Sequence, residues 1–196
     1  AHMCAWGGPR AARRWRKIVA RARAAEGTMG ESFTRAVAAT GLRLMAYKDE
    51  YEVARLHRLP AFRRALAETF DTTAAPRFHL APPLLTRHLD ARTGRPAKVA
   101  IGRPAVWAFA VLTQLRALRS TPLDPFGHTA ERRAERRLAA EYVALVDRLA
   151  TELTPETHAR CTRIAALGQM VRGFGPVKEA AIARYDSELA AALSAS

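Results

Sequence analysis

The sequence predicts a mainly α-helical protein: an irregular bundle of six or seven helices with one proline-rich, non-helical insertion. Apolar residues recur at spacings of three and four along most of the chain, which is the pattern of helices that each bury one face. Glycine and proline mark short breaks between these runs. Only residues 71–103 hold enough prolines to forbid a long helix. With 196 residues, the chain is long enough to bury a substantial core.

The composition is that of an ordinary globular protein, with 49% hydrophobic and 26% charged residues. No apolar run approaches the ~20 residues that a membrane-spanning helix needs, and the basic N-terminus is not followed by the apolar segment of a signal peptide. The two cysteines, Cys4 and Cys161, are too few for a disulfide framework or a cysteine-ligated cluster. We therefore expect a cytoplasmic protein that makes no membrane contact.

The formal net charge of +14 permits two interpretations. Only four of the 32 basic residues are lysine, and an arginine- and alanine-rich composition is typical of a GC-rich genome. The same charge would also attract nucleic acid, an anionic surface or an acidic protein. Composition alone leaves both interpretations open.

Residues 1–30 predict a basic amphipathic helix from about Pro9 to Ala25, and they hold seven basic residues against one acidic residue. Residues 1–3 are typical of the remnant that a cloning site leaves. We interpret residues 1–30 as a tag remnant plus a basic linker helix, and residues 31–196 as a helical accessory domain. A phosphate-contacting arm is the alternative interpretation of the basic helix.

A long helix is expected over residues 31–58, because apolar residues alternate there at spacings of four and three along one seam. Its middle, residues 44–56, concentrates two tyrosines and a mixed group of charges. The following helix is expected to begin at Pro60, since proline suits the first helical position. Its apolar residues recur every four positions and would dock it on the long helix: Phe62, Leu66 and Phe70.

Within the insertion at 71–103 we expect short extended pieces, with a two-stranded ribbon that joins Phe78–Leu80 to Val99–Ile101. A non-helical stretch of ~30 residues is long for a compact domain, and such loops are commonly binding or docking elements. A partner surface is therefore expected in the insertion, and an independent small-molecule site there is a further alternative.

The helix after the insertion is expected to run from Pro104 to about Arg119 and to be the most buried of all. Its apolar residues cover a wide face: Val106, Trp107, Phe109, Val111, Leu112, Leu115 and Leu118. A rigid turn at 120–128 separates it from a helix that Thr129 caps and that continues to about Glu152. Two more helices are expected over 154–168 and 177–193.

The sequence carries no recognisable catalytic or metal-binding motif. The six histidines fall one per element, without the spacing of metal ligands. No phosphate-binding glycine loop, dinucleotide fingerprint or nucleophile elbow is present. Cys161 lies within a helix without an obvious base and is interpreted as a core residue. We therefore expect no catalytic, cofactor-binding or metal-ligating residue in this chain.

The candidate site is a group of polar residues on the long helix and on the turn after residue 122, and we expect a structural or interface role for it. Its members are Tyr47, Lys48, Asp49, Glu50, Tyr51, Glu52, Arg55, Asp124, Arg132 and Arg133. One interpretation is ordinary pairing on a solvated face, with Glu52 spaced to reach Lys48 and Arg55. The other is a buried network that fixes the register of the helices.

Four stretches, taken in order, resemble a known family: LMAYKDEYEVARL at 44–56, FHLAPPLL at 78–85, LDPFGHTAERR at 123–133 and RGFGPVKEA at 172–180. They are similar to the C-terminal region of the fused, single-chain indolepyruvate ferredoxin oxidoreductases, a branch of the 2-oxoacid:ferredoxin oxidoreductases. The likeness covers nearly the whole chain, including the approach through Arg14-Trp15-Arg16.

This resemblance implies a large cytoplasmic parent enzyme that oxidatively decarboxylates aryl 2-oxoacids. Such enzymes use thiamine diphosphate and [4Fe-4S] clusters and pass electrons to ferredoxin, and their cofactor-binding domains lie upstream of this region. No catalytic residue is carried over. We therefore expect a non-catalytic accessory domain that serves assembly, with upstream domains, a second copy or an acidic ferredoxin as partners. The alternative is a free-standing basic helical protein that binds nucleic acid or another acidic partner.

Overall fold

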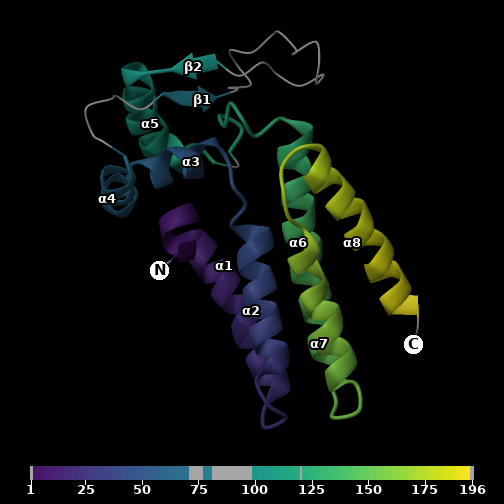
Figure 1. Cartoon of the computed structure of the whole chain (residues 1–196). Helices are drawn as coiled ribbons and strands as arrows, with labels where there is room; N and C mark the ends of the chain where they lie inside the picture. The colour runs from purple at the N-terminus through teal and green to yellow at the C-terminus, as the bar shows by residue number, and fades with distance from the viewer. Residues whose placement is uncertain (1, 71–76, 81–98, 120, 195–196) are drawn as a thin grey trace. The chain divides into compact units, whose positions relative to one another are not determined.

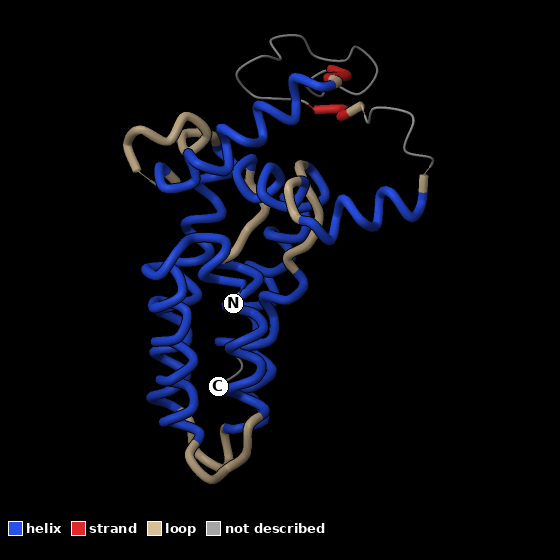
Figure 2. The backbone as a smooth tube through the Cα atoms, turned by 90° about the vertical axis from the view of Figure 1, so that its left-hand side faces the viewer, coloured by secondary structure: helices blue, strands red, loops and turns tan. Residues whose placement is uncertain are grey.

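A computed structural model describes residues 2–70, 77–80, 99–119 and 121–194. Across these ranges the chain forms eight α-helices and one two-stranded ribbon (Figure 1), and helix dominates in Figure 2. The expected mainly α-helical fold class is therefore confirmed. No helix in this part of the chain is long and apolar enough to cross a membrane.

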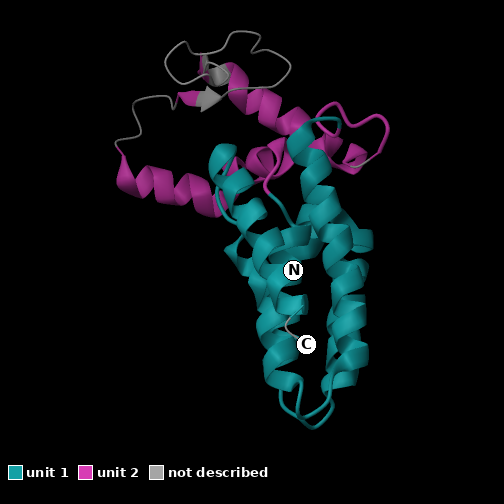
Figure 3. Ribbon diagram, turned by 90° about the vertical axis from the view of Figure 1, so that its right-hand side faces the viewer, with its two compact units in different colours: residues 1–47, 128–196 teal, residues 48–127 magenta. Residues whose placement is uncertain are grey.

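The chain divides into two compact units, which Figure 3 colours separately. Unit 1 contains residues 1–47 and 128–196, and unit 2 contains residues 48–127. This division differs from the expected boundary at residue 30. The first helix belongs to the body of unit 1, where Met3, Trp6 and Ile18 are buried in the core, instead of forming a separate linker.

Unit 1 is a set of packed helices. They are α1 (His2–Glu26), α2 (Ser32–Met45), α6 (Ala130–Glu152), α7 (His158–Ala166) and α8 (Pro176–Ser194), with a short 3-10 turn at Leu167–Met170. The α2 helix is central, because it contacts α1, α6, α7 and the 3-10 turn. Its buried face includes Phe33, Val37 and Leu44, which match the sequence periodicity.

Two glycines allow close packing against α2. A Cβ atom on Gly168, in the 3-10 turn, would lie 2.6 Å from Cγ2 of Thr40 and 2.9 Å from Cδ1 of Leu44. A Cβ atom on Gly41 would lie 2.8 Å from Cδ1 of Ile18 on α1. Neighbouring elements approach so closely at both positions that a side chain would clash with them. Glycine therefore fits there in spite of its low helix propensity.

The regular part of α1 begins at Pro9, where the sequence predicted it. Gly7 and Gly8 interrupt the helix before this point, and Gly8 has φ of 72°, a left-handed conformation that favours glycine. Within the regular part, the Nε1 atom of Trp15 donates a hydrogen bond of 3.1 Å to the carbonyl oxygen of Ala38. This bond ties α1 to α2.

Unit 2 contains the helices α3 (Glu50–His57), α4 (Pro60–Thr69) and α5 (Arg103–Leu115), a 3-10 turn at Arg116–Leu118, and the strands β1 (Phe78–Leu80) and β2 (Val99–Ile101). The strands pair antiparallel, with Phe78 opposite Ile101, as the sequence predicted. The small core of unit 2 forms where α3 packs against α5 through Ala54, Ala105 and Phe109. Most of the expected partner surface at 71–103 lies outside the described residues.

The expected long helix over 31–58 is wrong. The chain leaves the helical conformation after Met45 and starts α3 at Glu50, so residues 46–49 form a link. The cause is Asp49, whose extended backbone and capping carboxylate begin a new helix. The residues at 44–56 therefore comprise the end of α2, the link at 46–49 and most of α3, and the two helices lie in different units.

The expectation that α5 is the most buried helix is also wrong. Its packed side carries Ala105 and Phe109, whereas the side chain of Trp107 is 78% exposed and that of Val111 is 57% exposed. The predicted docking of α4 on the preceding helix is met in part. Phe62 contacts the ring of His57 on α3 at 4.9 Å, whereas Phe70 is exposed.

Candidate functional site: two buried polar clusters

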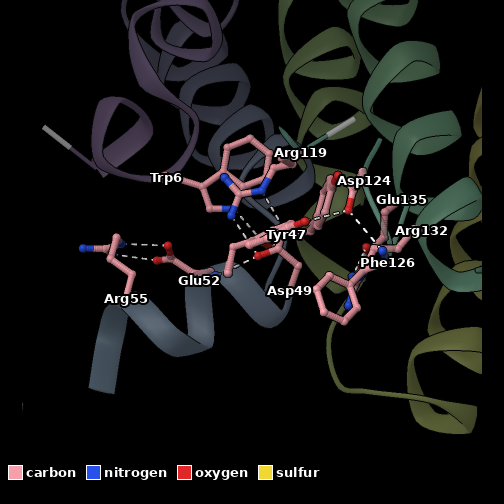
Figure 4. Close-up of polar contacts among 11 residues, drawn as sticks. Trp6, Tyr47, Asp49, Glu52, Arg55, Arg119, Asp124, Phe126, Arg132 and Glu135 are labelled. Atoms are coloured by element: carbon pink, nitrogen blue, oxygen red, sulfur yellow. Dashed lines mark hydrogen bonds and ion pairs between the residues drawn. The ribbon is translucent and has the colours of Figure 1, made fainter. Parts of the chain in front are cut away.

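Several of the candidate polar residues lie in two clusters, one within each unit, and Figure 4 draws side chains from both. We name them the Asp49 cluster, in unit 2, and the Glu135 cluster, in unit 1. The Asp49 cluster contains Asp49, Tyr51, Arg119 and Asp124, and the Glu135 cluster contains Tyr47, Arg132, Glu135 and Lys178. The carboxylates of both clusters are almost completely buried, since the exposed fractions of Asp49, Asp124 and Glu135 do not exceed 4%.

The Asp49 cluster begins at the N-terminus of α3. Asp49 caps this helix, because its Oδ1 atom accepts a hydrogen bond of 2.8 Å from the backbone N–H of Glu52. Both carboxylate oxygens of Asp49 also accept from the guanidinium of Arg119, at 2.5 and 2.8 Å (Figure 4). A bidentate pair of this kind has a fixed geometry and is stronger than a neutral hydrogen bond. Asp49 therefore joins the start of α3 to the segment after α5.

Tyr51 and Asp124 form the second half of the same cluster. The hydroxyl of Tyr51 donates a hydrogen bond of 2.9 Å to Oδ1 of Asp124, which also accepts from the backbone N–H of Phe126 at 3.1 Å. The ring of Tyr51 meets the ring of Phe126 edge-on at 5.4 Å, and the Arg119 guanidinium lies 5.5 Å from the centre of the Tyr51 ring. Burial, followed by the hydrogen bond to Asp124, raises the pKa of Tyr51. Tyr51 is thus held as a neutral hydrogen-bond donor.

Glu52 and Arg55 form an ion pair along α3, with bonds of 2.6 and 2.8 Å. The side chain of Arg55 is only 14% exposed, and the hydrogen bond to Glu52 raises the pKa of its guanidinium. Lys48 is exposed and lies outside the helix, in the link at 46–49, so the helical spacing that was expected to join it to Glu52 does not exist. Glu50 is half-buried in the first turn of α3.

The Glu135 cluster joins α6 to the N-terminal turn of α8. The carboxylate of Glu135 accepts from the guanidinium of Arg132, one turn earlier on α6, and from the ammonium group of Lys178 on α8. Both partners are largely buried, with exposed fractions of 10% and 13% for their side chains. One carboxylate therefore compensates two cations, which offsets part of the cost of removing them from water.

Tyr47 belongs to the same cluster through its ring and its backbone. The guanidinium of Arg132 lies 5.5 Å from the centre of the Tyr47 ring, a cation–π distance. The Nε1 atom of Trp6 donates a hydrogen bond of 2.7 Å to the carbonyl oxygen of Tyr47, and the two rings meet edge-on at 5.1 Å. These contacts bring together α1, α6 and Tyr47, which lies just after the end of α2.

The sequence therefore identified some members of each cluster and misplaced others. Tyr51, Asp124 and Arg132 are members of the expected polar group that lie in these clusters. Arg133 is exposed and donates to the carbonyl oxygen of His128, so it lies outside both clusters. The residues that sequence reasoning missed are Glu135, one turn from Arg132 on α6, and three partners from distant segments: Trp6, Arg119 and Lys178.

A further buried carboxylate, Glu26, was also missed. Its oxygens accept hydrogen bonds from the backbone N–H groups of Phe33 and Thr34, each at 2.9 Å, and one oxygen lies 2.8 Å from Nε2 of His158. Burial alone would raise the pKa of Glu26, but the hydrogen bonds from Thr34, His158 and Phe33 outweigh it and lower the pKa to about 2. Glu26 is therefore a charged link between the ends of three helices.

Comparison with known proteins places the chain in a family. Residues 1–191 match a family of unknown function, DUF6537. The chain belongs to the DUF6537 family. No curated protein and no solved structure matches it.

The DUF6537 match includes both polar clusters and the whole of α1. The basic helix is thus part of the family region, in agreement with the burial of Met3 and Trp6. The buried carboxylates are bonded within the chain, because Glu26, Asp49, Asp124 and Glu135 each accept hydrogen bonds from groups of their own unit. Within the described residues of this DUF6537 chain, no group of three or more His, Cys, Asp and Glu residues is placed to hold a metal ion.

Proposed function

We propose that this chain is a non-catalytic accessory region of an indolepyruvate (aryl 2-oxoacid):ferredoxin oxidoreductase, and that it serves assembly or the packing of domains. The parent enzyme would depend on thiamine diphosphate and iron–sulfur clusters. The proposal starts from the resemblance of the stretches at 44–56, 78–85, 123–133 and 172–180 to the C-terminal region of that family. In such an enzyme, the reaction takes place on other domains, and this region supports their arrangement.

The observation that carries the proposal is the position of the polar residues from these stretches. Tyr51, from the first stretch, bonds to Asp124 in the third. Arg132, also in the third, shares the carboxylate of Glu135 with Lys178 from the fourth. The stretches that carry the resemblance thus supply at least one partner in each of these buried polar contacts. Buried pairs of this kind can specify one arrangement of helices, which supports a structural role.

The cofactors of the proposed parent would be bound elsewhere. A [4Fe-4S] cluster is held by four thiolates, and this chain has two cysteines, of which Cys4 is exposed and Cys161 is buried. Burial raises the pKa of the Cys161 thiol, which disfavours the thiolate that a metal needs. The residues of this chain alone therefore do not fit a cluster, and no reaction step is assigned to them.

The proposal is tested by isolating the native protein from its source organism with an antibody raised against residues 1–196. We expect a polypeptide much larger than 21.5 kDa that carries thiamine diphosphate and iron and oxidises an aryl 2-oxoacid. A native product of about the mass of this chain, without these cofactors, would overturn the proposal. If that product also bound DNA at physiological salt, the nucleic-acid alternative would replace it.

Removal of the region from the parent then separates an accessory role from a catalytic one. We expect an enzyme that lacks residues 1–196 to keep its thiamine diphosphate and iron but to lose dimer assembly or transfer of electrons to ferredoxin. The readouts are cofactor content, sedimentation and turnover. If assembly, turnover and their salt dependence all remain normal, the accessory role is wrong.

A further inference from the structure

The outer side of α1 carries an unusual concentration of positive charge. All seven basic residues of this helix are exposed, and its one acidic residue, Glu26, is buried. Five of the basic residues lie at helical spacings that place them on one side of the helix. We name these five the basic stripe: Arg10, Arg13, Arg14, Lys17 and Arg21.

The other side of α1 is fixed in the core of unit 1. Its buried residues include Ala12, Ile18 and Ala22, and the helix packs against α2 and α6. The indole N–H groups of Trp6 and Trp15 donate to backbone carbonyl oxygens of the same unit. The basic stripe is therefore presented on a rigid helix, and the apolar side of α1 is not free to insert elsewhere.

The charge of the stripe is not balanced by neighbouring acids. Within the described part of the chain, Arg10, Arg13, Arg14 and Lys17 form no ion pair, and Arg21 approaches Asp147 only to 3.9 Å. Basic residues on α6 and α8 behave differently, because Arg137, Arg148 and Arg184 each pair with a glutamate four residues later.

The distribution of charge along unit 1 shows the same contrast. Residues 128–196 contain ten basic and nine acidic side chains, whereas residues 1–30 contain seven basic and one acidic. A compositional bias toward arginine would raise the positive charge in both segments. Its concentration on one face of one helix instead favours a functional surface.

We propose that the basic stripe is a docking surface for an acidic protein. Arginine forms bidentate bonds with carboxylates, and a row of exposed cations accelerates encounter with a surface of opposite charge. A second copy of this chain is disfavoured as the occupant, because its own net charge is +14. This inference goes beyond the proposed function and does not depend on it, since the stripe is complete within unit 1.

Nucleic acid fits the same surface less well. Binding of single strands commonly uses exposed aromatic rings on which bases stack, whereas Trp6 is buried and Trp15 is half-buried in this helix. Arginine can read guanine edges in a duplex, but the exposed positions beside the stripe include Ala20 and Ala24, which offer no contact to a base edge or a phosphate. Phosphate contacts alone would give only weak, salt-sensitive binding.

The test compares two variants of the full chain that carry the same net charge. The stripe variant is Arg10→Gln, Arg13→Gln, Arg14→Gln, Lys17→Gln, and the matched control is Arg133→Gln, Arg148→Gln, Arg163→Gln, Arg184→Gln, all at exposed positions. The probes are a 20-residue poly(L-glutamate) and a 20-base-pair DNA duplex, each labelled with a fluorophore. Binding is measured by anisotropy at about 0.05 and 0.15 M NaCl, where screening differs.

We expect the stripe variant to bind the poly(L-glutamate) at least about tenfold more weakly than the wild type, while the control stays within about threefold. A third variant, Arg10→Lys, Arg13→Lys, Arg14→Lys, keeps the charge and should retain binding; circular dichroism checks that each variant is folded. Equal losses in the stripe and control variants would overturn the proposal, because net charge would then explain binding. Tighter binding of the duplex than of the peptide, lost in the stripe variant, would assign the surface to nucleic acid.

Discussion

At the scale of single residues, Asp49 is the clearest example of a polar group whose role comes from two bonds at once. It caps α3 through the N–H of Glu52 and forms a bidentate pair with Arg119, although its side chain is only 3% exposed. Removal of one partner of a buried pair is costly because it leaves the other charge unpaired away from water. The loss of the cap adds to this cost.

Replacement of Asp49 by alanine should therefore lower the free energy of unfolding by about 3 kcal/mol or more. Chemical denaturation followed by circular dichroism measures the change. Glu68→Ala is the matched control, since Glu68 is an exposed carboxylate of the same unit, and its loss should change stability by no more than about 0.5 kcal/mol. Similar effects of the two substitutions would show that the Asp49 cluster contributes nothing beyond ordinary surface charge.

The sequence could have supplied part of this cluster. Asp49 followed three residues later by Glu52 has the spacing of a helix start, with acids in the first turn. This local signal was outweighed by the apolar periodicity, which continues through residues 46–49 and predicted one long helix. Arg119 lies 70 residues away from Asp49, and no local pattern indicates a pair between groups so far apart in the chain.

At the scale of elements, Glu26 connects the ends of three helices. It stands in the last turn of α1, where a negative charge is unfavourable, but it faces the first N–H groups of α2 and the side chain of His158 at the start of α7. The unpaired N–H groups at a helix start favour a negative charge. The same carboxylate thus compensates groups of two other helices.

The lowered pKa of Glu26 has a consequence for stability against pH. The pKa of Glu26 in the folded chain is about 2, below the ordinary value of 4.5, so the folded structure stabilises the charged carboxylate. This contribution is complete above pH 4.5 and is lost as the pH falls toward 2. We expect Glu26→Gln to be markedly less stable than the wild type at pH 7, and the difference should shrink steadily below pH 4.5.

Unfolding of both proteins between pH 2.5 and 7 measures this convergence. Glu31→Gln is the control, because Glu31 is exposed at the start of α2 and its ion pair with Arg35 is also exposed. Its stability should follow that of the wild type across the whole pH range. A difference between the Glu26 variant and the wild type that remains constant from pH 7 to pH 2.5 would contradict the assigned role.

Most helices could be predicted from the sequence, but which face of a helix is buried could not. Terminal signals placed Pro60 and the Thr129 cap correctly, because these depend only on neighbouring residues. On α5, however, Ala105 and Phe109 recur at the same spacing as Trp107 and Val111. Periodicity alone cannot choose between two apolar faces of one helix, and the packing against α3 selected the first.

At the scale of the whole molecule, the two units differ in how much apolar surface they bury. The core of unit 1 extends over α1, α2, α6, α7 and α8, and it includes completely buried side chains such as Phe33, Tyr142 and Val146. The described core of unit 2 is small, and α4 has no buried residue. Since local stability follows buried contacts, the units should open at different free energies.

Hydrogen exchange followed by mass spectrometry should therefore give the strongest protection in α2 and α6, weaker protection in α3 and α5, and the weakest in α4. Two reciprocal variants separate the units. Phe109→Ala should lower the free energy of unfolding of unit 2 by about 3 kcal/mol. It should accelerate exchange in α3 and α5 and leave exchange in α2 and α6 unchanged. Val146→Ala should accelerate exchange in α2 and α6 and leave α3 and α5 unchanged. Equal acceleration of exchange in all four helices by either substitution would contradict this prediction. It would mean that the chain unfolds as one cooperative body, and that the greater exposure of α4 does not lower the stability of that helix.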